Sequence, residues 1–126
     1  MSTALLVGLG GFVGSAFRYL TARWVSGLFG EHWFPFGTLA VNVVGCLLIG
    51  GLAGLSDARG VLGGNSRIFL FAGVLGGFTT FSAFGYETLT LLRNGYVAGA
   101  IGNVALQVAL GLAAVWGAYA AARAMG

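Results

Sequence analysis

Apolar residues fill four long runs of the chain, and short stretches between the runs hold most of the charged residues. The runs cover about residues 3–26, 37–55, 67–92 and 95–123. About 20 apolar residues in helical form cross the hydrocarbon core of a bilayer, and short connections favour antiparallel neighbours. The pattern therefore predicts an all-α membrane protein in which residues 1–126 form a single transmembrane domain of four helices.

The middle of the third run is interrupted by glycines and hydroxyl residues. A bilayer offers no water to the backbone groups that such an interruption frees, so it is tolerated only where protein or a wet cavity surrounds it. We therefore expect the third helix to be broken at mid-membrane, and we expect the break to be functional. The interrupting residues are Gly76, Gly77, Thr79 and Thr80.

Polar side chains recur at helical spacing in the neighbouring runs. Thr38 and Asn42 are four residues apart in the second run, and Asn103 and Gln107 are four residues apart in the fourth. For Asn42, bonding between helices and a pore-lining role are both open, and the polar third run favours the pore. The amides of the fourth run indicate either a buried polar track or hydrogen bonds between helices.

The second half of the third run combines aromatic rings with hydroxyl groups. Phe81 and Phe84 are three residues apart and share a helix face, with Thr80 and Ser82 beside them. Such a pair usually packs in a core. However, hydroxyls, amides and the positive edges of aromatic rings can also solvate a small anion without a full charge that would trap it. These residues therefore fit an anion path as well as core packing.

Two charged residues lie inside or near the ends of the apolar runs. Arg18 either reaches the interface with its long side chain or faces a wet vestibule. Glu87 is either a functional carboxylate or, with Arg93 six residues later, a marker of the interface. Both Arg18 and Glu87 are retained as candidates for the anion path.

The composition excludes several classes of protein. Of the 126 residues, 58% are hydrophobic and 7% charged, whereas about a quarter of a soluble domain is charged. One cysteine, one histidine (His32, in the first connection) and three acids assemble no catalytic set and no transition-metal site, so we expect no enzyme. Six scattered arginines form no nucleic-acid patch and suit lipid head groups.

The arginines are balanced between the two predicted membrane sides. The side of both termini holds Arg59, Arg67 and Arg123. The other side holds Arg93 and one or both of Arg18 and Arg23, so three arginines face two or three. Lys and Arg in short loops set orientation, so this balance predicts insertion both ways. An antiparallel, dual-topology homodimer would then bring two copies of the broken helix together.

Three segments are similar to the bacterial fluoride channels called Fluc or CrcB. They are GGFVGSAFRY at residues 10–19, PFGTLAVNVVG at 35–45, and GGFTTFSAF at 76–84 followed by Glu87. The similarity covers the first three helices, and its Gly-Gly-x-Thr-Thr-Phe-Ser element is specific. The resemblance implies a dual-topology dimer in the bacterial cytoplasmic membrane that passes fluoride passively out of the cell through two antiparallel pores.

The resemblance also implies roles for individual residues. Phe81, Phe84 and Asn42 would line the pores. A structural sodium ion, Na+, would lie at the dimer centre on the backbone carbonyls of Gly76 and Thr79, and no organic cofactor is implied.

The chain departs from the family pattern at two places. Family members often have serine at the position of Ala83, and a serine or tyrosine track on the fourth helix where this chain has Asn103 and Gln107. The polar track of the fourth helix is therefore less well defined than the phenylalanine pair.

Two other functions are compatible with four short helices. A small multidrug exporter would need a carboxylate deep in its first helix, and the first run has none. A structural membrane protein could be held together by GxxxG spacings such as Gly10 to Gly14 and Gly50 to Gly54, but it would not need the broken third helix. Both alternatives are therefore less favoured than a fluoride channel.

Overall fold

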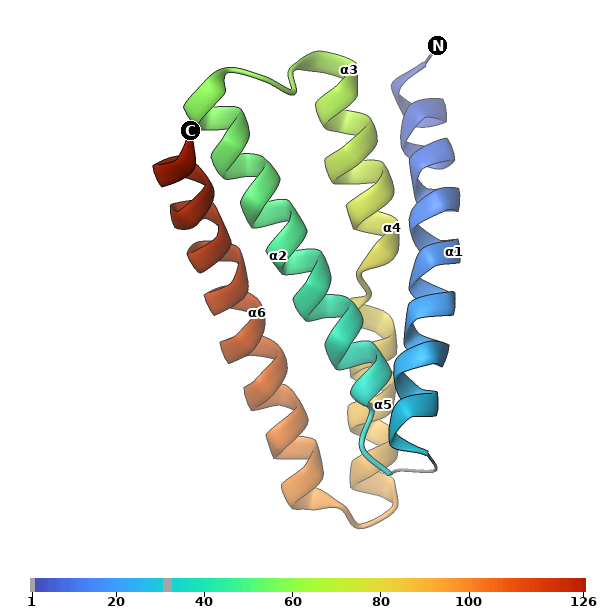
Figure 1. The fold of residues 1–126 in the computed structure, drawn as a ribbon. Coiled ribbons are helices and arrows are strands. Elements are labelled where there is room, and N and C mark those ends of the chain that lie inside the picture. The colour runs from blue at the N-terminus through green and yellow to red at the C-terminus, as the bar shows by residue number, and fades with distance from the viewer. Residues whose placement is uncertain (1, 31–32) are drawn as a thin grey trace.

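The fold is a bundle of four membrane-length helical spans. The computed structural model describes residues 2–30 and 33–126, so His32 lies outside the described residues. Figure 1 shows the spans running up and down, with both termini at the same end. The spans are Thr3–Phe29, Phe36–Arg59, Gly64–Arg93 and Val97–Met125. Within the described residues there is no strand, which confirms the all-α fold with four spans.

The first two spans have ordinary helix ends. Helix α1 (Thr3–Phe29) begins after Ser2, whose side chain accepts an N–H of the first turn at 3.2 Å. Helix α2 (Phe36–Arg59) ends at Gly60, which has a positive φ of 67°. That backbone conformation favours glycine and stops the helix.

The third span is a series of helical pieces rather than one helix. In chain order they are α3 (Gly64–Arg67), the π-helical segment η1 (Ile68–Leu75), α4 (Gly76–Phe78) and α5 (Phe81–Arg93). Thr79 and Thr80 between the last two pieces are extended, with ψ of 159° and 121°. The predicted break is therefore confirmed, and it lies at these two threonines.

The prediction that Gly76 and Gly77 interrupt the helix is wrong. Both residues are helical in α4, and Gly76 has φ −62° and ψ −37°. Gly77 instead permits a close approach to α1, because a Cβ there would lie 2.9 Å from the Cα of Gly11. Gly77 thus serves packing, and the two threonines break the helix.

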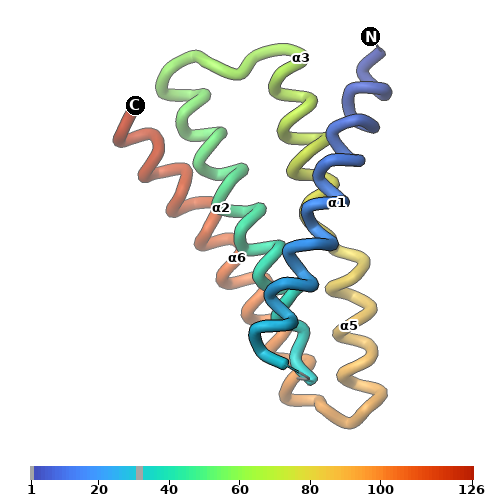
Figure 2. The backbone as a smooth tube through the Cα atoms, turned by 45° about the vertical axis from the view of Figure 1, so that its right-hand side comes forward, coloured from blue at the N-terminus to red at the C-terminus, as the bar shows by residue number. Residues whose placement is uncertain are grey.

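Helix α1 and the first half of the third span meet through bare backbone. A Cβ on Gly10 would lie 2.8 Å from the Cα of Gly73, and one on Gly14 would collide with the backbone of Val74 and Phe78. Figures 1 and 2 both show α1 beside this half of the span. The GxxxG spacing of α1 therefore places its backbone directly against η1 and α4.

Helices α2 and α6 (Val97–Met125) form the other half of the bundle. They run side by side over most of their length. A Cβ on Gly50 would collide with the backbone of Val115, and one on Gly54 would lie 2.5 Å from the carbonyl oxygen of Tyr119. Helix α5 packs against α6, so the two halves of the third span have different principal neighbours.

Candidate functional site

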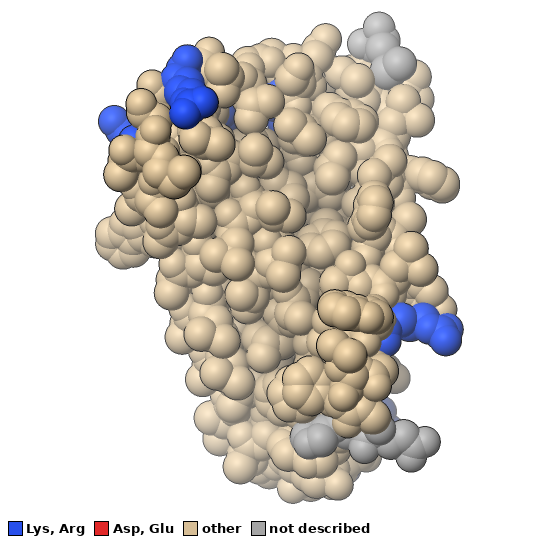
Figure 3. All heavy atoms as spheres, in the orientation of Figure 1, with Lys and Arg blue, Asp and Glu red and all other residues tan. Residues whose placement is uncertain are grey.

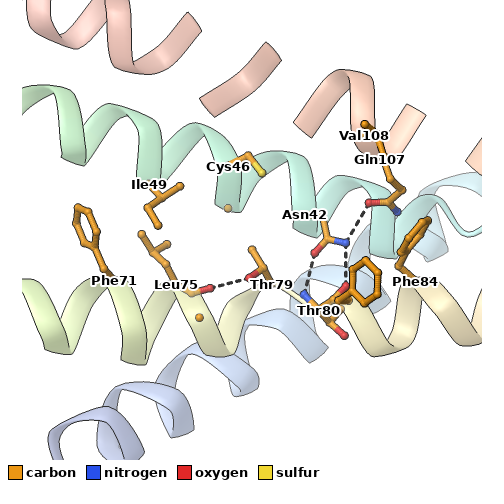
Figure 4. A pocket seen from close by; sticks show the side chains of 13 residues that line it. Asn42, Cys46, Ile49, Phe71, Leu75, Thr79, Thr80, Phe84, Gln107 and Val108 are labelled. Atoms are coloured by element: carbon orange, nitrogen blue, oxygen red, sulfur yellow. Dashed lines mark hydrogen bonds between the residues drawn. The ribbon is translucent and has the colours of Figure 1, made fainter. Parts of the chain in front are cut away.

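The break is held by the side chain of Asn42. The Thr80 N–H donates to Asn42 Oδ1 at 2.9 Å, and Asn42 Nδ2 donates to the Thr80 carbonyl at 3.0 Å. Asn42 Nδ2 also donates to Gln107 Oε1 at 3.0 Å. We call this set, drawn in Figure 4, the amide relay. It joins α2, the break and α6 through three hydrogen bonds.

Two backbone carbonyls lose their helical donors at the break. In an unbroken helix the Thr80 N–H would donate to the Gly76 carbonyl, and the Ala83 N–H to the Thr79 carbonyl. Here the first N–H donates to Asn42, and the second donates to Thr80 Oγ1 at 3.1 Å. The carbonyls of Gly76 and Thr79 are thereby released from helical pairing.

Arg18 contacts the same break from α1. Its Nε donates to the carbonyl of Gly77 at 3.1 Å, and its side chain is half-buried. Because α1 and α4 are in backbone contact, the guanidinium reaches an oxygen that the break deprives of its helical donor. The structure thus places Arg18 against the break.

A cavity of about 350 Å³ opens beside the amide relay, between α2, the third span and α6. Its polar lining comes from Asn42, Thr79, Thr80 and Gln107, and its aromatic lining from Phe71, Phe81 and Phe84 (Figure 4). The rings of Phe81 and Phe84 meet edge to face, with centroids 5.4 Å apart. No charged residue is among the described residues that line this cavity.

Several residues that line the cavity were not identified from the sequence, among them Cys46 and Phe71. Cys46 follows Asn42 by four residues on α2, and this helical spacing could have identified it. Phe71 lies in η1, where nothing in an apolar sequence distinguishes the cavity-lining ring from its neighbours. Both residues widen the apolar part of the lining.

The other predicted polar residues form separate pairs. Thr38 Oγ1 donates to Glu87 Oε2 at 2.9 Å. Asn103, which is fully buried, donates to Thr88 Oγ1 at 3.0 Å. The Ser82 hydroxyl is 3.3 Å from that of Thr80. Of these residues, the structure places only Thr80 on the cavity beside the relay.

Glu87 lines a second cavity of about 340 Å³ at the end of the bundle, together with Trp33 and Tyr86. Within the part of the chain that the structure describes, three buried side-chain atoms have no hydrogen-bond partner: Glu87 Oε1, Asn103 Oδ1 and Gln107 Nε2. Gln107 is the one of the three residues that also lines the cavity at the break.

Charge is sparse among the described residues, and Arg18, which contacts the break, does not line this cavity. In Figure 3 some arginine side chains lie near the upper end of the visible face and others on its right side below the middle, and a wide band without charged side chains separates them. In the part of the chain that the structure describes, no three His, Cys, Asp or Glu residues are grouped to hold a metal. A cation at the break would therefore rely on neutral oxygens, those of the backbone among them.

These features define a small multi-pass membrane protein whose polar groups gather at a helix break, an arrangement typical of channels and transporters. The chain belongs to the CrcB family: the profile described as CrcB-like protein, Camphor Resistance (CrcB), matches residues 5–119. The predicted family is thus confirmed. With four spans and bacterial relatives, it is a multi-pass protein of the cytoplasmic membrane.

Three relatives illustrate the similarity, each named fluoride-specific ion channel FluC. The chain is 45% identical to that of Methylobacillus flagellatus, over 92% of this chain and 91% of the relative. It is 46% identical to that of Opitutus terrae, over 97% and 93%. It is 48% identical to that of Rhizobium leguminosarum bv. trifolii, over 99% of each chain.

Proposed function

We propose that this protein is a fluoride channel that passes fluoride passively out of the cell and so lowers intracellular fluoride. The observation that carries the proposal is the 45–48% identity, over nearly the full length of both chains, to relatives named fluoride-specific ion channels. Those relatives are named as channels and not as enzymes, which agrees with the prediction from composition.

The cavity at the break supports passage of a small anion. Its polar lining offers hydroxyl and amide groups, and Phe81 and Phe84 lie beside them. Ring edges and neutral donors attract an anion, yet they hold it less tightly than a guanidinium would. A lining without charged groups therefore suits an ion that must bind and leave quickly.

We extend the proposal to an antiparallel homodimer with two pores. Phe81 is 82% exposed, although it lines the cavity at the break, and a second copy would cover it. Membrane lipid would surround the exposed apolar side chains of α1, such as Phe12 and Trp24. Arg59 and Arg123 lie in the last helical turn at one end of the bundle and Arg93 in the last turn of α5 at the other, which agrees with insertion in both orientations.

A central sodium ion is part of the same proposal. The carbonyls of Gly76 and Thr79 fit such an ion, because side chains divert both of their helical donors. Neutral oxygens without a carboxylate suit a monovalent cation better than a divalent one. In a homodimer, two carbonyls from each copy would supply four oxygens, and the ion's charge would favour anions nearby.

The function is tested with purified protein in liposomes loaded with fluoride. Efflux is followed with a fluoride electrode while an ionophore shunts the membrane potential and no proton gradient is present. A channel releases fluoride under these conditions, whereas a proton-coupled multidrug exporter does not. Absence of fluoride efflux from liposomes that contain folded protein would reject the proposed function.

Phe81→Ile and Phe84→Ile are each expected to lower fluoride efflux roughly tenfold, because isoleucine keeps apolar bulk and removes the positive ring edge. Phe12→Ile is the matched control, since Phe12 is 76% exposed on α1, away from the cavity. Efflux is compared at equal protein content. Unchanged rates in both cavity variants would show that the rings do not contact the ion.

A C-terminal tag is expected to be accessible from both sides of the membrane in cells that make the unmodified protein. Val61→Lys with Ser66→Lys should bias insertion to one orientation, because both residues are exposed in or beside the second connection. Val61→Gln with Ser66→Gln is the uncharged control. A tag found on one side only in the unmodified protein would exclude the antiparallel dimer.

A further inference from the structure

The second cavity, of about 340 Å³, lies at the end of the bundle opposite to the chain termini (Figure 1). Its walls come from the end of α1, the connection before α2 and the last turns of α5. Four aromatic residues line it: Trp33, Phe34, Tyr86 and Tyr96. Glu87 is the one charged residue among the described residues of this lining. The cavity therefore combines several aromatic rings with a single carboxyl group.

The carboxyl group of Glu87 is only half satisfied. Its Oε2 accepts a hydrogen bond from Thr38 Oγ1 at 2.9 Å. Its Oε1 is buried and has no hydrogen-bond partner among the described residues. A buried carboxylate oxygen without a donor is costly, and the described lining holds no lysine or arginine that could pair with it. The site thus lacks both an N–H donor and a positive charge.

The aromatic rings of the same lining suit a cation. Trp33 and Tyr96 stack in parallel, with ring centroids 5.0 Å apart and planes that differ by 8°. Trp33 also meets the Phe34 ring edge to face, with centroids 5.7 Å apart. The faces of such rings carry negative potential and attract cations. Because Trp33, Tyr86 and Tyr96 are all exposed, a cation from solution or from the membrane surface can reach the lining.

We propose that this cavity binds an organic cation that carries N–H groups, either an ammonium or a guanidinium. One N–H would be donated to Glu87 Oε1, and the positive charge would lie against the aromatic rings. A quaternary ammonium has no N–H for this oxygen, and a divalent metal ion would find one carboxylate instead of the several oxygen ligands that it needs. Glu87 does not line the uncharged cavity at the break. The cation site is therefore separate from that cavity, and it does not depend on fluoride conduction.

Two sources supply this chemistry. Dissolved amines and guanidines carry it, and so does the ammonium headgroup of phosphatidylethanolamine. Tryptophan and tyrosine residues near the ends of membrane helices commonly lie at the depth of lipid headgroups, so a headgroup would reach the cavity. The test is therefore made first in detergent and then in two lipids.

Trp33 reports on the site once it is the only tryptophan. The chain has three tryptophans, and Trp24 and Trp116 are both exposed, so Trp24→Phe with Trp116→Phe leaves Trp33 alone. Its fluorescence is followed in a non-ionic detergent while methylguanidinium chloride is added. A saturable change is expected, with roughly tenfold weaker binding of tetramethylammonium chloride and no saturable response to sodium chloride. Absence of a saturable change with methylguanidinium, or equal affinity for tetramethylammonium, would overturn the proposal.

Glu87→Gln removes the negative charge and keeps a carbonyl oxygen for Thr38 Oγ1. In the single-tryptophan protein it is expected to weaken methylguanidinium binding roughly tenfold or more. Asp57→Asn is the matched control, because Asp57 also accepts a side-chain hydroxyl, that of Tyr119 at 2.6 Å, near the opposite end of the bundle. Unchanged affinity in Glu87→Gln, or an equal loss in Asp57→Asn, would overturn the role of the Glu87 carboxylate.

Tyr86→Leu keeps the proposal testable should Glu87→Gln fail to fold. Tyr86 is 68% exposed, so its replacement leaves the packing of the bundle intact. Loss of this ring is expected to weaken methylguanidinium binding roughly threefold. An unchanged affinity in this variant would contradict contact between the cation and the aromatic lining.

Nanodiscs made with phosphatidylcholine or with phosphatidylethanolamine distinguish the two sources. Phosphatidylcholine has a quaternary headgroup without N–H, so methylguanidinium is expected to bind there as in detergent. Weaker binding in phosphatidylethanolamine would show that the lipid headgroup occupies the cavity, whereas equal binding would assign the cavity to a dissolved cation. Absence of binding in both lipids would overturn the site. None of these measurements uses fluoride, so their failure would leave the proposed channel function standing, and absence of fluoride efflux would leave the cation site standing.

Discussion

Asn42→Asp is expected to reduce fluoride efflux by roughly a hundredfold, because it removes two hydrogen bonds that hold the break. Aspartate can still accept from the Thr80 N–H, but it has no hydrogen for the Thr80 carbonyl or for Gln107 Oε1. The Thr80 carbonyl, which can only accept, would then face a carboxylate oxygen. A negative charge beside the cavity would also repel the anion.

The control for this change is Asn65→Asp, because Asn65 lies exposed in α3 at the end of the bundle. Efflux is measured at equal protein content, and size-exclusion chromatography verifies assembly of both variants. The two substitutions have the same chemistry, so a difference between them reports on position alone. Efflux of Asn42→Asp close to that of Asn65→Asp would contradict the importance of the relay.

Gly76→Val is expected to abolish fluoride efflux and to weaken the dimer. A Cβ at Gly76 would meet only the Phe71 carbonyl oxygen, at an ordinary contact distance of 3.5 Å, so the single chain has room for it. The added methyl groups would instead obstruct the approach of a second copy and of the proposed sodium ion. We expect the rate of fluoride efflux to fall roughly a hundredfold or more.

Gly85→Val is the matched control, because a Cβ at Gly85 in α5 meets no atom within 4 Å. Gly77 is unsuitable, since its Cβ would lie 2.7 Å from the Gly11 carbonyl oxygen within the same chain. A second arm compares sodium with potassium and with a large organic cation, after hours of exchange. Full efflux and full assembly with sodium demonstrably removed would contradict the proposed ion site.

The four spans and the broken helix were predictable because they depend on local sequence. Apolar length sets the spans, and a run of hydroxyl residues at mid-membrane is a local feature. Gly77 was misread because its role depends on α1: it remains helical and packs on Gly11. Sequence spacing alone could not distinguish a helix breaker from a contact surface.

The partners of the polar side chains could not be predicted. Asn42 and Gln107 are 65 residues apart in sequence, and only the packing of α2 on α6 brings them together. Asn103 and Gln107 share a helix face, which indicated one common track. The structure instead pairs Asn103 with Thr88 and Gln107 with Asn42, because different neighbours cross α6 at these two heights.

The two halves of the third span rest on different helices, so mutations in those helices are expected to affect different parts of the proposed site. The first half rests on α1 through glycine backbone, and the second half packs on α6. Mutations in α1 can therefore shift the carbonyls of the proposed cation site while leaving the rings of the anion path in place. Asn42, which is bonded to both the break and α6, is the residue through which a change in one part of the site would reach the other.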